Sequence, residues 1–358
     1  MKKRTNPKSA IWKILIKGII PAMIVFIVVF QIPTTINDTI SENKIYEKEK
    51  SNSNINDNEA KQINSINVWT DIGYETPEDI KKLMESVSED YKKLSCDGKI
   101  LSYDYSKQNA TAEYDGIYIR NTTKTHSVDI GEMLNKKVYA SVSQDSPTVL
   151  LYHTHTTESY ELLEREYYAI SRSSRSSDSE QNVIRVGKAI KNTLEKNGFK
   201  VIHDETIYDE SVSGAYDRSR EAVTKILKEN PSIQVVLDIH RDSIYLKNET
   251  RIKTVTEING KKAAQIMLTT GCEDGNVTSF PNWEKNLTFA LNLQKALVDD
   301  NPSLMRPLLF TSRKYNMDLM PCALHIEIGT DSNTLEEAVY SAELFSQSLS
   351  KLLKEYIV

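Results

Sequence analysis

The stretch from Ile233 to Ile239 limits the possible folds of this chain more than any other segment, because it is apolar on both faces. A strand of this kind is typical of the centre of a sheet that is covered on both sides. Short apolar runs of strand type alternate with segments of helical spacing before and after it. This alternation predicts an α/β fold in which a mostly parallel mixed sheet carries helices on both faces.

The alternation is clear from Pro147 to the end of the chain. Two helix ends carry their own signals: Asn197-Gly198 is typical of a helix C-terminus, and Thr334 followed by Glu337 matches a capping box. We expect strands at 149–152, 199–202, 233–239, 263–269 and 323–328, and helices at 183–194, 215–229, 283–298 and 334–356.

The N-terminus combines a run of basic residues with an apolar segment from Ile11 to Ile32. The apolar segment has the length of a helix that spans a bilayer, and basic flanks of such helices stay in the cytoplasm. We therefore expect a single-pass anchor in the cell membrane, with the folded part extracytoplasmic. A cleaved signal peptide is the alternative, although the residues after the segment form a poor cleavage site. The basic residues before the first acid, Asp38, are Lys2, Lys3, Arg4, Lys8, Lys13 and Lys17.

Composition divides the chain into five expected regions. The net charge of −5 argues against a nucleic-acid binder that relies on a basic surface. Residues 37–66 are polar and nearly free of aromatics, so they cannot bury a core and are typical of a flexible linker. The expected regions are a cytoplasmic basic tail (1–10), a transmembrane anchor (11–32), a linker (33–66), an accessory N-terminal region or extension (67–146) and a catalytic domain (147–358).

Histidines and carboxylates follow or end several of the expected strands. His153 and His155 follow the first strand, His240 follows the apolar central strand, and Glu327 lies in a later one. In an open α/β sheet, ligands bind beyond the carboxyl ends of the strands, so these side chains are expected to meet in one cleft. Imidazoles with a carboxylate suit a zinc ion, and this set predicts a metallohydrolase.

The sequence leaves alternatives for two of the ligands in this set. His153 and His155 are one residue apart, so on a strand both would face the same way, and His155 is the first choice because it is nearer the loop. Glu180 opens a helix, and Glu158 is a ligand, a supporting group or a loop acid. Either carboxylate is left open as the third ligand.

The groups around His240 and Glu327 have expected roles of their own. A metal-bound imidazole needs its second nitrogen held, and Asp238 or Asp242 is placed to hold that of His240. Glu327 lies inside an apolar strand, where an unpaired charge is costly, and beside a metal it would act as general base. His325 shares the strand face of Glu327 and could contribute.

Three motifs together resemble the stage II sporulation protein P family. They are the segment from Val149 to Tyr160, which contains HTHTTESY, the DIHRDS string at 238–243, and residues 326–338. This family comprises membrane-anchored cell-wall hydrolases of endospore-forming bacteria and is similar to zinc-dependent N-acetylmuramoyl-L-alanine amidases. The resemblance implies His155 (or His153), Glu180 and His240 as zinc ligands and Glu327 as the catalytic residue. The glycine-rich turn usual around the first histidine is absent here.

The resemblance also implies a substrate and a partner. The expected reaction is hydrolysis of the amide between the muramic lactyl group and L-alanine in peptidoglycan, with possible cleavage of peptide cross-links. Stage II sporulation protein D is the implied partner, and Arg241 is a candidate for holding a carboxylate of the stem peptide. Two alternatives are a membrane-tethered wall-binding scaffold without catalysis and a metal peptidase that attacks peptide bonds only.

Overall fold

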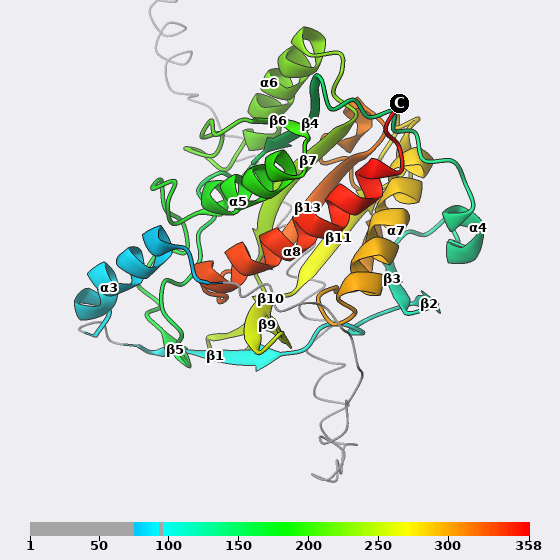
Figure 1. Cartoon of the computed structure of the whole chain (residues 1–358). Coiled ribbons are helices and arrows are strands. Elements are labelled where there is room, and N and C mark those ends of the chain that lie inside the picture. The colour runs from blue at the N-terminus through cyan, green and yellow to red at the C-terminus, as the bar shows by residue number, and fades with distance from the viewer. Residues whose placement is uncertain (1–74, 93–95) are drawn as a thin grey trace, which may run out of the picture. The chain divides into compact units, whose positions relative to one another are not determined.

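A computed structural model describes residues 75–92 and 96–358 of the chain. Its main feature is a large twisted sheet with helices packed against it (Figure 1). Among the described strands of this sheet, only the pairings β2–β3 and β11–β13 are antiparallel. The mostly parallel mixed sheet expected from the sequence is therefore confirmed. In spatial order the strands are β2 (Ala112–Tyr114), β3 (Ile117–Asn121), β12 (Leu308–Thr311), β11 (Ile266–Gly271), β13 (Ala323–Thr330), β7 (Val235–Asp242), β4 (Pro147–Tyr152) and β6 (Lys200–His203).

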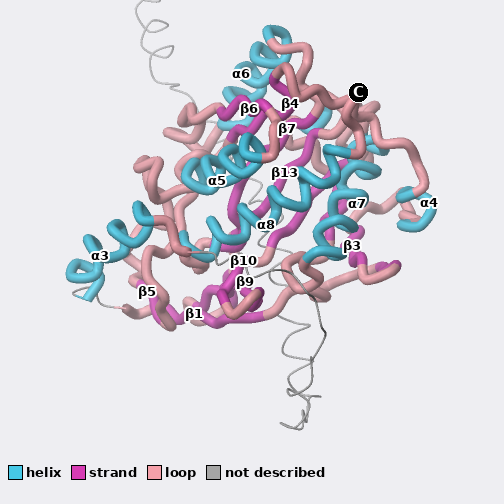
Figure 2. The backbone as a smooth tube through the Cα atoms, in the orientation of Figure 1, coloured by secondary structure: helices cyan, strands magenta, loops and turns pink. Residues whose placement is uncertain are grey.

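Helices cover both faces of this sheet, as expected (Figure 2). One face packs against α5 (Val183–Lys196), α7 (Trp283–Asp300) and α8 (Leu335–Lys354). The other face packs against α6 (Ala215–Glu229) and the 3₁₀ helix η2 (Met317–Leu319). Two further helices, α3 (Glu78–Lys92) and the short α4 (Ile130–Leu134), add side chains to the larger core.

Strand β7 lies in the middle of the described sheet, and its side chains alternate between the two cores. Leu237 and Ile239 pack in the core under α5, α7 and α8. Val236 packs in the core under α6 together with Val223. Because side chains alternate along a strand, Asp238 belongs to the α6 face, as does His240.

A second, smaller sheet joins segments that are far apart in the sequence. Its strands are β10 (Lys261–Ala264), β9 (Thr250–Ile258), β1 (Gly98–Tyr103) and β5 (Tyr167–Tyr168), with β8 (Tyr245–Leu246) also paired to β9. The single strand expected at 263–269 is wrong: the chain passes from this sheet to the large one at Gln265. The Gln265 side chain is buried and donates hydrogen bonds to Asp104 and to the Ser303 carbonyl, so the crossing point is fixed by polar contacts that periodicity cannot predict.

Both helix ends marked in the sequence are as predicted. Gly198 adopts φ +93° directly after the C-cap Asn197, a conformation that glycine reaches without strain. Thr334 accepts a hydrogen bond from the Glu337 amide, and the Glu337 side chain accepts one from the Thr334 amide. The capping box therefore fixes where α8 begins, immediately after the strand that carries Glu327.

The N-terminal regions are described only in part. The described residues of the expected accessory region pair with both sheets through β1, β2 and β3. The expected tail, anchor (11–32) and linker lie outside the described residues. Among the helices of residues 75–92 and 96–358, none is long and apolar enough to cross a membrane.

Candidate functional site

The α6 face of the sheet carries a polar cluster where β7 and β13 lie side by side. In the parallel register of these strands, Asp238 is opposite His325, and His240 is opposite Glu327. All four side chains alternate with core residues, so they point to the same face. We define the polar cluster as these four residues together with His155 and Glu158, which the loop after β4 brings to the same place.

Asp238 orients the imidazole of His240. The carboxylate of Asp238 accepts hydrogen bonds from the Thr154 amide (2.8 Å) and the Thr154 hydroxyl (2.7 Å). Its Oδ1 lies 2.8 Å from Nε2 of His240. Burial favours neutral His240, but the carboxylates of Asp238 and Glu158 outweigh it and hold the pKa of His240 well above its usual value.

Glu158 faces the other nitrogen of the same ring. Its Oε2 lies 3.2 Å from Nδ1 of His240 and accepts a hydrogen bond from the Arg241 amide at 3.2 Å. Arg175 approaches Oε1 of Glu158 at 3.7 Å. Burial raises the pKa of Glu158, but His240 and Arg241 outweigh burial and hold this pKa well below its usual range. Glu158 is therefore an ionised carboxylate inside the cluster.

His155 completes this side of the cluster. Its ring lies 5.4 Å from the His240 ring, centroid to centroid, at an angle of 85°. Its side chain is only partly buried, whereas His240 is fully buried. Burial and the nearby His240 lower the pKa of His155 to about 4. His155 is thus a neutral imidazole near neutral pH, which is the form that binds metals.

His153 points away from the polar cluster and lies beneath α5. Strand β4 ends at Tyr152, so the expectation that both histidines extend the strand and share a face is wrong. Nδ1 of His153 donates to the Ile239 carbonyl at 2.9 Å, and its Nε2 lies 2.8 Å from Nε2 of His203. Since Nδ1 carries the proton, Nε2 of His153 accepts from His203. Both ring nitrogens of His153 are therefore used within the fold, and His155 is the histidine at the cluster.

Glu180 lies outside the polar cluster, at the surface. Its carboxylate is half exposed and pairs with Lys188 at 2.6 Å and with Arg185 at 3.9 Å. The loop between β4 and α5 places Glu158, rather than Glu180, beside His240. The position of Glu180 before a helix was not enough to locate its carboxylate.

Arg241 and Asp242 also differ from their expected places. Arg241 is buried, and its guanidinium donates to the carbonyls of Ser159 (3.0 Å) and Ser174 (2.7 Å). It therefore fastens the loop that carries Glu158 and does not face outward toward a substrate. Asp242 pairs with Arg306 at 2.9 Å, so of the two aspartates on β7 it is Asp238 that lies beside the ring of His240.

The chemistry of the polar cluster fits a bound divalent metal. Four buried atoms of the cluster form no hydrogen bond with any described part of the chain: Nδ1 of His155, Nε2 of His240, Nδ1 of His325 and Oε2 of Glu327. Nε2 of His240 lies 2.8 Å from Asp238, but the pair is not aligned as a hydrogen bond. Unpaired buried polar atoms are costly and call for a partner such as a metal or water. Asp238, His240 and His325 also offer ligand atoms that all lie within 4.8 Å of one another. Neutral imidazoles and carboxylates are the donors that zinc takes in hydrolytic sites.

Two tyrosines that the sequence analysis did not identify border the polar cluster. Tyr315 stacks on His325 with ring centroids 4.9 Å apart, and Tyr216 packs edge-on against His155 at 5.5 Å. Tyr216 lies in α6, the element before β7, and Tyr315 lies in the turn after β12; the chain has 18 tyrosines. No local pattern separates these two from the others, because their position depends on how α6 and η2 pack.

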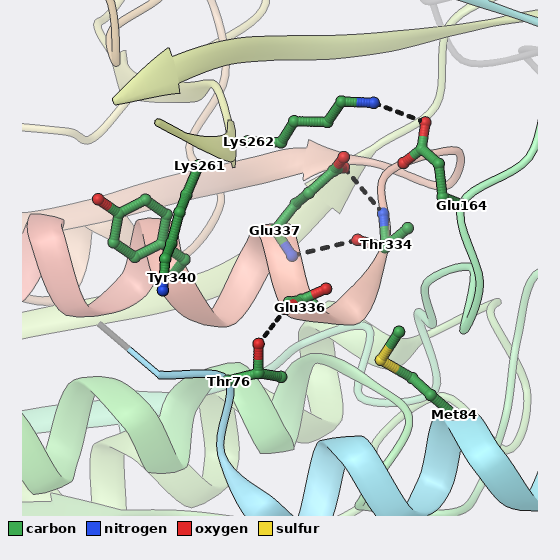
Figure 3. A pocket seen from close by; sticks show the side chains of 9 residues that line it. All are labelled: Thr76, Met84, Glu164, Lys261, Lys262, Thr334, Glu336, Glu337 and Tyr340. Carbon is green, nitrogen blue, oxygen red and sulfur yellow. Dashed lines mark hydrogen bonds and ion pairs between the residues drawn. The ribbon is translucent and has the colours of Figure 1, made fainter. Parts of the chain in front are cut away.

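A separate hollow of about 370 Å³ lies at the start of α8 (Figure 3). Its charged groups are paired with one another: Glu164 with Lys262 and with the buried Lys253, and Glu337 also with Lys253. Glu336 accepts a hydrogen bond from Thr76. Each of these carboxylates already has a partner within the chain, and the hollow brings no imidazoles together, so the polar cluster is the candidate site.

Comparison with known proteins gives a family match and several partial structural overlaps. A family model described as Stage II sporulation protein P matches residues 31–350. The chain is 30% identical over 220 residues to Stage II sporulation protein P of Bacillus subtilis (strain 168), which covers 57% of this chain and 51% of that protein. The chain thus spans about half the length of the curated relative that it matches.

Several of the structural overlaps are with amidases. The N-acetylmuramoyl-L-alanine amidase AmiC2 of Nostoc punctiforme overlaps with a TM-score of 0.34 and 12% identity, covering 60% of this chain and 99% of that one. The N-acetylmuramoyl-L-alanine amidase of Clostridium difficile 630 overlaps with a TM-score of 0.34 and 15% identity, covering 59% and 96%.

Proposed function

Because the chain belongs to the stage II sporulation protein P family, we propose that it is a zinc-dependent peptidoglycan hydrolase that acts during sporulation. The proposed bond is the amide between the lactyl group of N-acetylmuramic acid and L-alanine. The observation that carries the proposal is the polar cluster, with its buried imidazole and carboxylate atoms that lack a partner within the described chain. Such atoms suit a metal site better than a structural core.

We propose His155, Glu158 and His240 as the zinc ligands. Glu158 replaces Glu180 in this set because its carboxylate lies 3.2 Å from His240. Asp238 is assigned to holding the ring of His240, since its oxygens already accept two hydrogen bonds from Thr154. A zinc ion bound here would activate water and polarise the scissile carbonyl.

Glu327 is the proposed general base. Its Oε1 lies 2.8 Å from Nε2 of His325, which leaves Oε2 to face the attacking water. Glu327 takes a proton from water as the oxygen attacks the carbonyl carbon, and it delivers that proton to the amine as the C–N bond breaks. The products are the free lactyl carboxylate and a peptide with a new L-alanine amino group.

Wall digestion tests the reaction. Purified full-length chain, loaded with zinc, should release L-alanine amino termini from peptidoglycan, and both chelation and Glu327→Gln should abolish the release. Release that persists under both treatments contradicts the proposal. New amino groups on residues other than L-alanine would indicate cleavage of peptide cross-links. Wall binding without any bond cleavage would support the alternative of a tethered scaffold.

A separate measurement distinguishes the two possible ligand sets around His240. The alternative set is Asp238, His240 and His325. Under our assignment, His155→Gln loses bound zinc and His325→Gln keeps it. If His325→Gln loses zinc and His155→Gln keeps it, the alternative ligand set is supported, and the hydrolase proposal is unaffected.

The location and partner belong to the same proposal. Residues 11–32 are proposed to anchor the chain in the cell membrane with the polar cluster outside, within reach of the wall. Stage II sporulation protein D is the proposed partner. Protease digestion of intact cells tests the topology, and co-purification of the two full-length proteins tests the partnership.

A further inference from the structure

Five aromatic rings form a closed circuit that includes two of the proposed zinc ligands. His240 stacks on His325 with centroids 4.1 Å apart, and His325 stacks on Tyr315 at 4.9 Å. Tyr315 stacks on Tyr216 at 5.2 Å. Tyr216 then contacts His155 edge-on, and His155 contacts His240 edge-on, which closes the circuit. Of the five rings, His325, Tyr315 and Tyr216 are neither proposed ligands nor the proposed base.

The backbone at Tyr315 is held in an unfavourable conformation. Tyr315 has φ +44° and Asn316 has φ +58°, so two consecutive non-glycine residues lie in the left-handed region. Such residues are costly and persist only where surrounding contacts hold them. The Asn316 side chain is buried and donates to the Tyr216 carbonyl (3.2 Å) and to the Ser219 hydroxyl (3.0 Å). These contacts fasten the turn to α6 and fix where the Tyr315 ring lies.

His325 links Tyr315 to the proposed general base. It is in stacked contact with both His240 and Tyr315, and its Nε2 lies 2.8 Å from Oε1 of Glu327. We propose that Tyr315 is a positioning residue for Glu327 and acts through His325. The proposal rests on the proposed hydrolase function. In this proposal, the strained turn at 315–316 fixes the Tyr315 ring. The Tyr315 ring in turn keeps the His325 ring oriented so that Nε2 binds the Glu327 carboxylate.

The positioning role of Tyr315 follows from its contact with the His325 ring. A stacked aromatic pair restricts the tilt of both rings, and loss of one ring lets the other rotate about its side-chain bonds. Rotation of His325 would move Nε2 away from Glu327. The carboxylate would then lose the hydrogen bond that aims Oε2.

The first experiment compares Tyr315→Leu with Tyr315→Phe in the zinc-loaded full-length chain. Tyr315→Leu should lower kcat by about 10-fold or more with little change in KM, because misplacing a catalytic group affects the chemical step. Tyr315→Phe keeps the ring and should restore kcat to nearly the wild-type value. Zinc content should be unchanged in both.

The matched control is Tyr167→Leu, which removes an exposed tyrosine of the small sheet. An unchanged kcat in Tyr315→Leu, or a loss in Tyr315→Phe as large as that in Tyr315→Leu, overturns the proposal.

A double-mutant cycle tests whether the effect passes through His325. If it does, Tyr315→Leu should lower kcat in the wild-type background but add little to His325→Gln. Additive losses would mean that Tyr315 acts directly on substrate, and they would overturn the positioning role. If Tyr315→Leu does not fold, Asn316→Gly replaces it, because glycine accepts the positive φ but lacks the side-chain hydrogen bonds that fasten the turn to α6. An unchanged kcat in Asn316→Gly then contradicts the proposal.

A readout independent of activity separates this inference from the hydrolase proposal. Stacking on Tyr315 should shift the ring-proton resonances of His325 in a histidine-labelled sample. Tyr315→Leu should move those resonances, and Tyr315→Phe should leave them close to wild type. If wild-type protein cleaves no wall bond yet shows these shifts, the hydrolase proposal fails and the contact stands. If the wild-type protein cleaves the amide but the His325 resonances do not change in Tyr315→Leu, the positioning role is contradicted and the hydrolase proposal is not.

Discussion

Oε2 of Glu158 lies 3.2 Å from Nδ1 of His240, and both side chains are buried. The ionised carboxylate and the imidazole are thus held together at the one place where the chain also brings His155. Glu180, which also precedes α5, is instead paired with Lys188 on the surface. The choice between the two glutamates decides the proposed ligand set.

We predict that Glu158→Gln and Glu180→Gln differ in bound zinc. Glutamine keeps the size of glutamate but removes the charge, so Glu158→Gln should weaken zinc binding by about 10-fold or more. Glu180→Gln is the matched control and should bind zinc like the wild type. Metal content after dialysis and competition with a chromogenic chelator measure both. Loss of zinc in Glu180→Gln alone would restore the ligand set implied by the family resemblance.

We predict that Gly187→Ala destabilises the fold. A Cβ at this position of α5 would lie 2.6 Å from Nε2 of His203 and 2.8 Å from Nε2 of His153. In an open helix this change would stabilise by roughly 0.5–1 kcal/mol, but here overpacking should cost about 1–3 kcal/mol. Urea unfolding measures the difference. In a His203→Ala background only the close contact with His153 remains, and that ring is free to shift into the vacated space, so the cost should be smaller. An equal cost in both backgrounds would rule out His203 as its cause.

We predict that the His153–His203 pair makes stability depend on pH. Burial lowers the pKa of His153 to about 4 and, together with His153, that of His203 to about 2. In the unfolded chain both have a pKa near 6.5, so below that pH the unfolded state binds more protons than the folded state. Stability is therefore full above pH 6.5 and falls as the pH drops toward 4.

The measurement for this prediction is the free energy of unfolding at pH 7 and pH 5. The pair should account for a loss of about 4 kcal/mol over this interval, roughly 2 for each histidine. His203→Gln keeps a donor for His153 but does not titrate, so its loss should be smaller than that of the wild type. The same loss in both proteins would show that the pair is not the source of the pH dependence.

The sequence was sufficient to locate His240 and Glu327. Both lie in apolar strands of the sheet, where alternation fixes the face of every side chain and parallel pairing brings the strand ends together. The same reasoning predicted the covered central strand and the start of α8 at Thr334, because both depend on local patterns.

The remaining parts of the site depend on contacts that no local pattern encodes. The segment from His153 to Asn182 is mostly loop, so periodicity could not decide which of its histidines and glutamates turns toward β7. His153 is held beneath α5 by hydrogen bonds to His203 of β6 and to the Ile239 carbonyl of β7. Tyr315 reaches the cluster only because the turn after β12 is fastened to α6.

We predict that Asp238→Asn weakens zinc binding without abolishing it. Asp238 accepts two hydrogen bonds from Thr154 and lies 2.8 Å from Nε2 of His240. Asparagine keeps this shape but loses the charge that supports the imidazole, and loss of such a supporting carboxylate typically lowers metal affinity about 10–100-fold. Competition with a chelator measures the affinity, and added zinc should restore most of the hydrolysis.

The matched control for this prediction is Asp242→Asn, on the same strand. Asp242 pairs with Arg306 and makes no contact with His240, so its replacement should leave zinc affinity close to wild type. Equal losses in the two variants would mean that the effect comes from charge on β7 in general. Complete loss of zinc in Asp238→Asn, not recovered by excess metal, would make Asp238 a direct ligand. The metal would then lie on the Nε2 side of His240, toward His325.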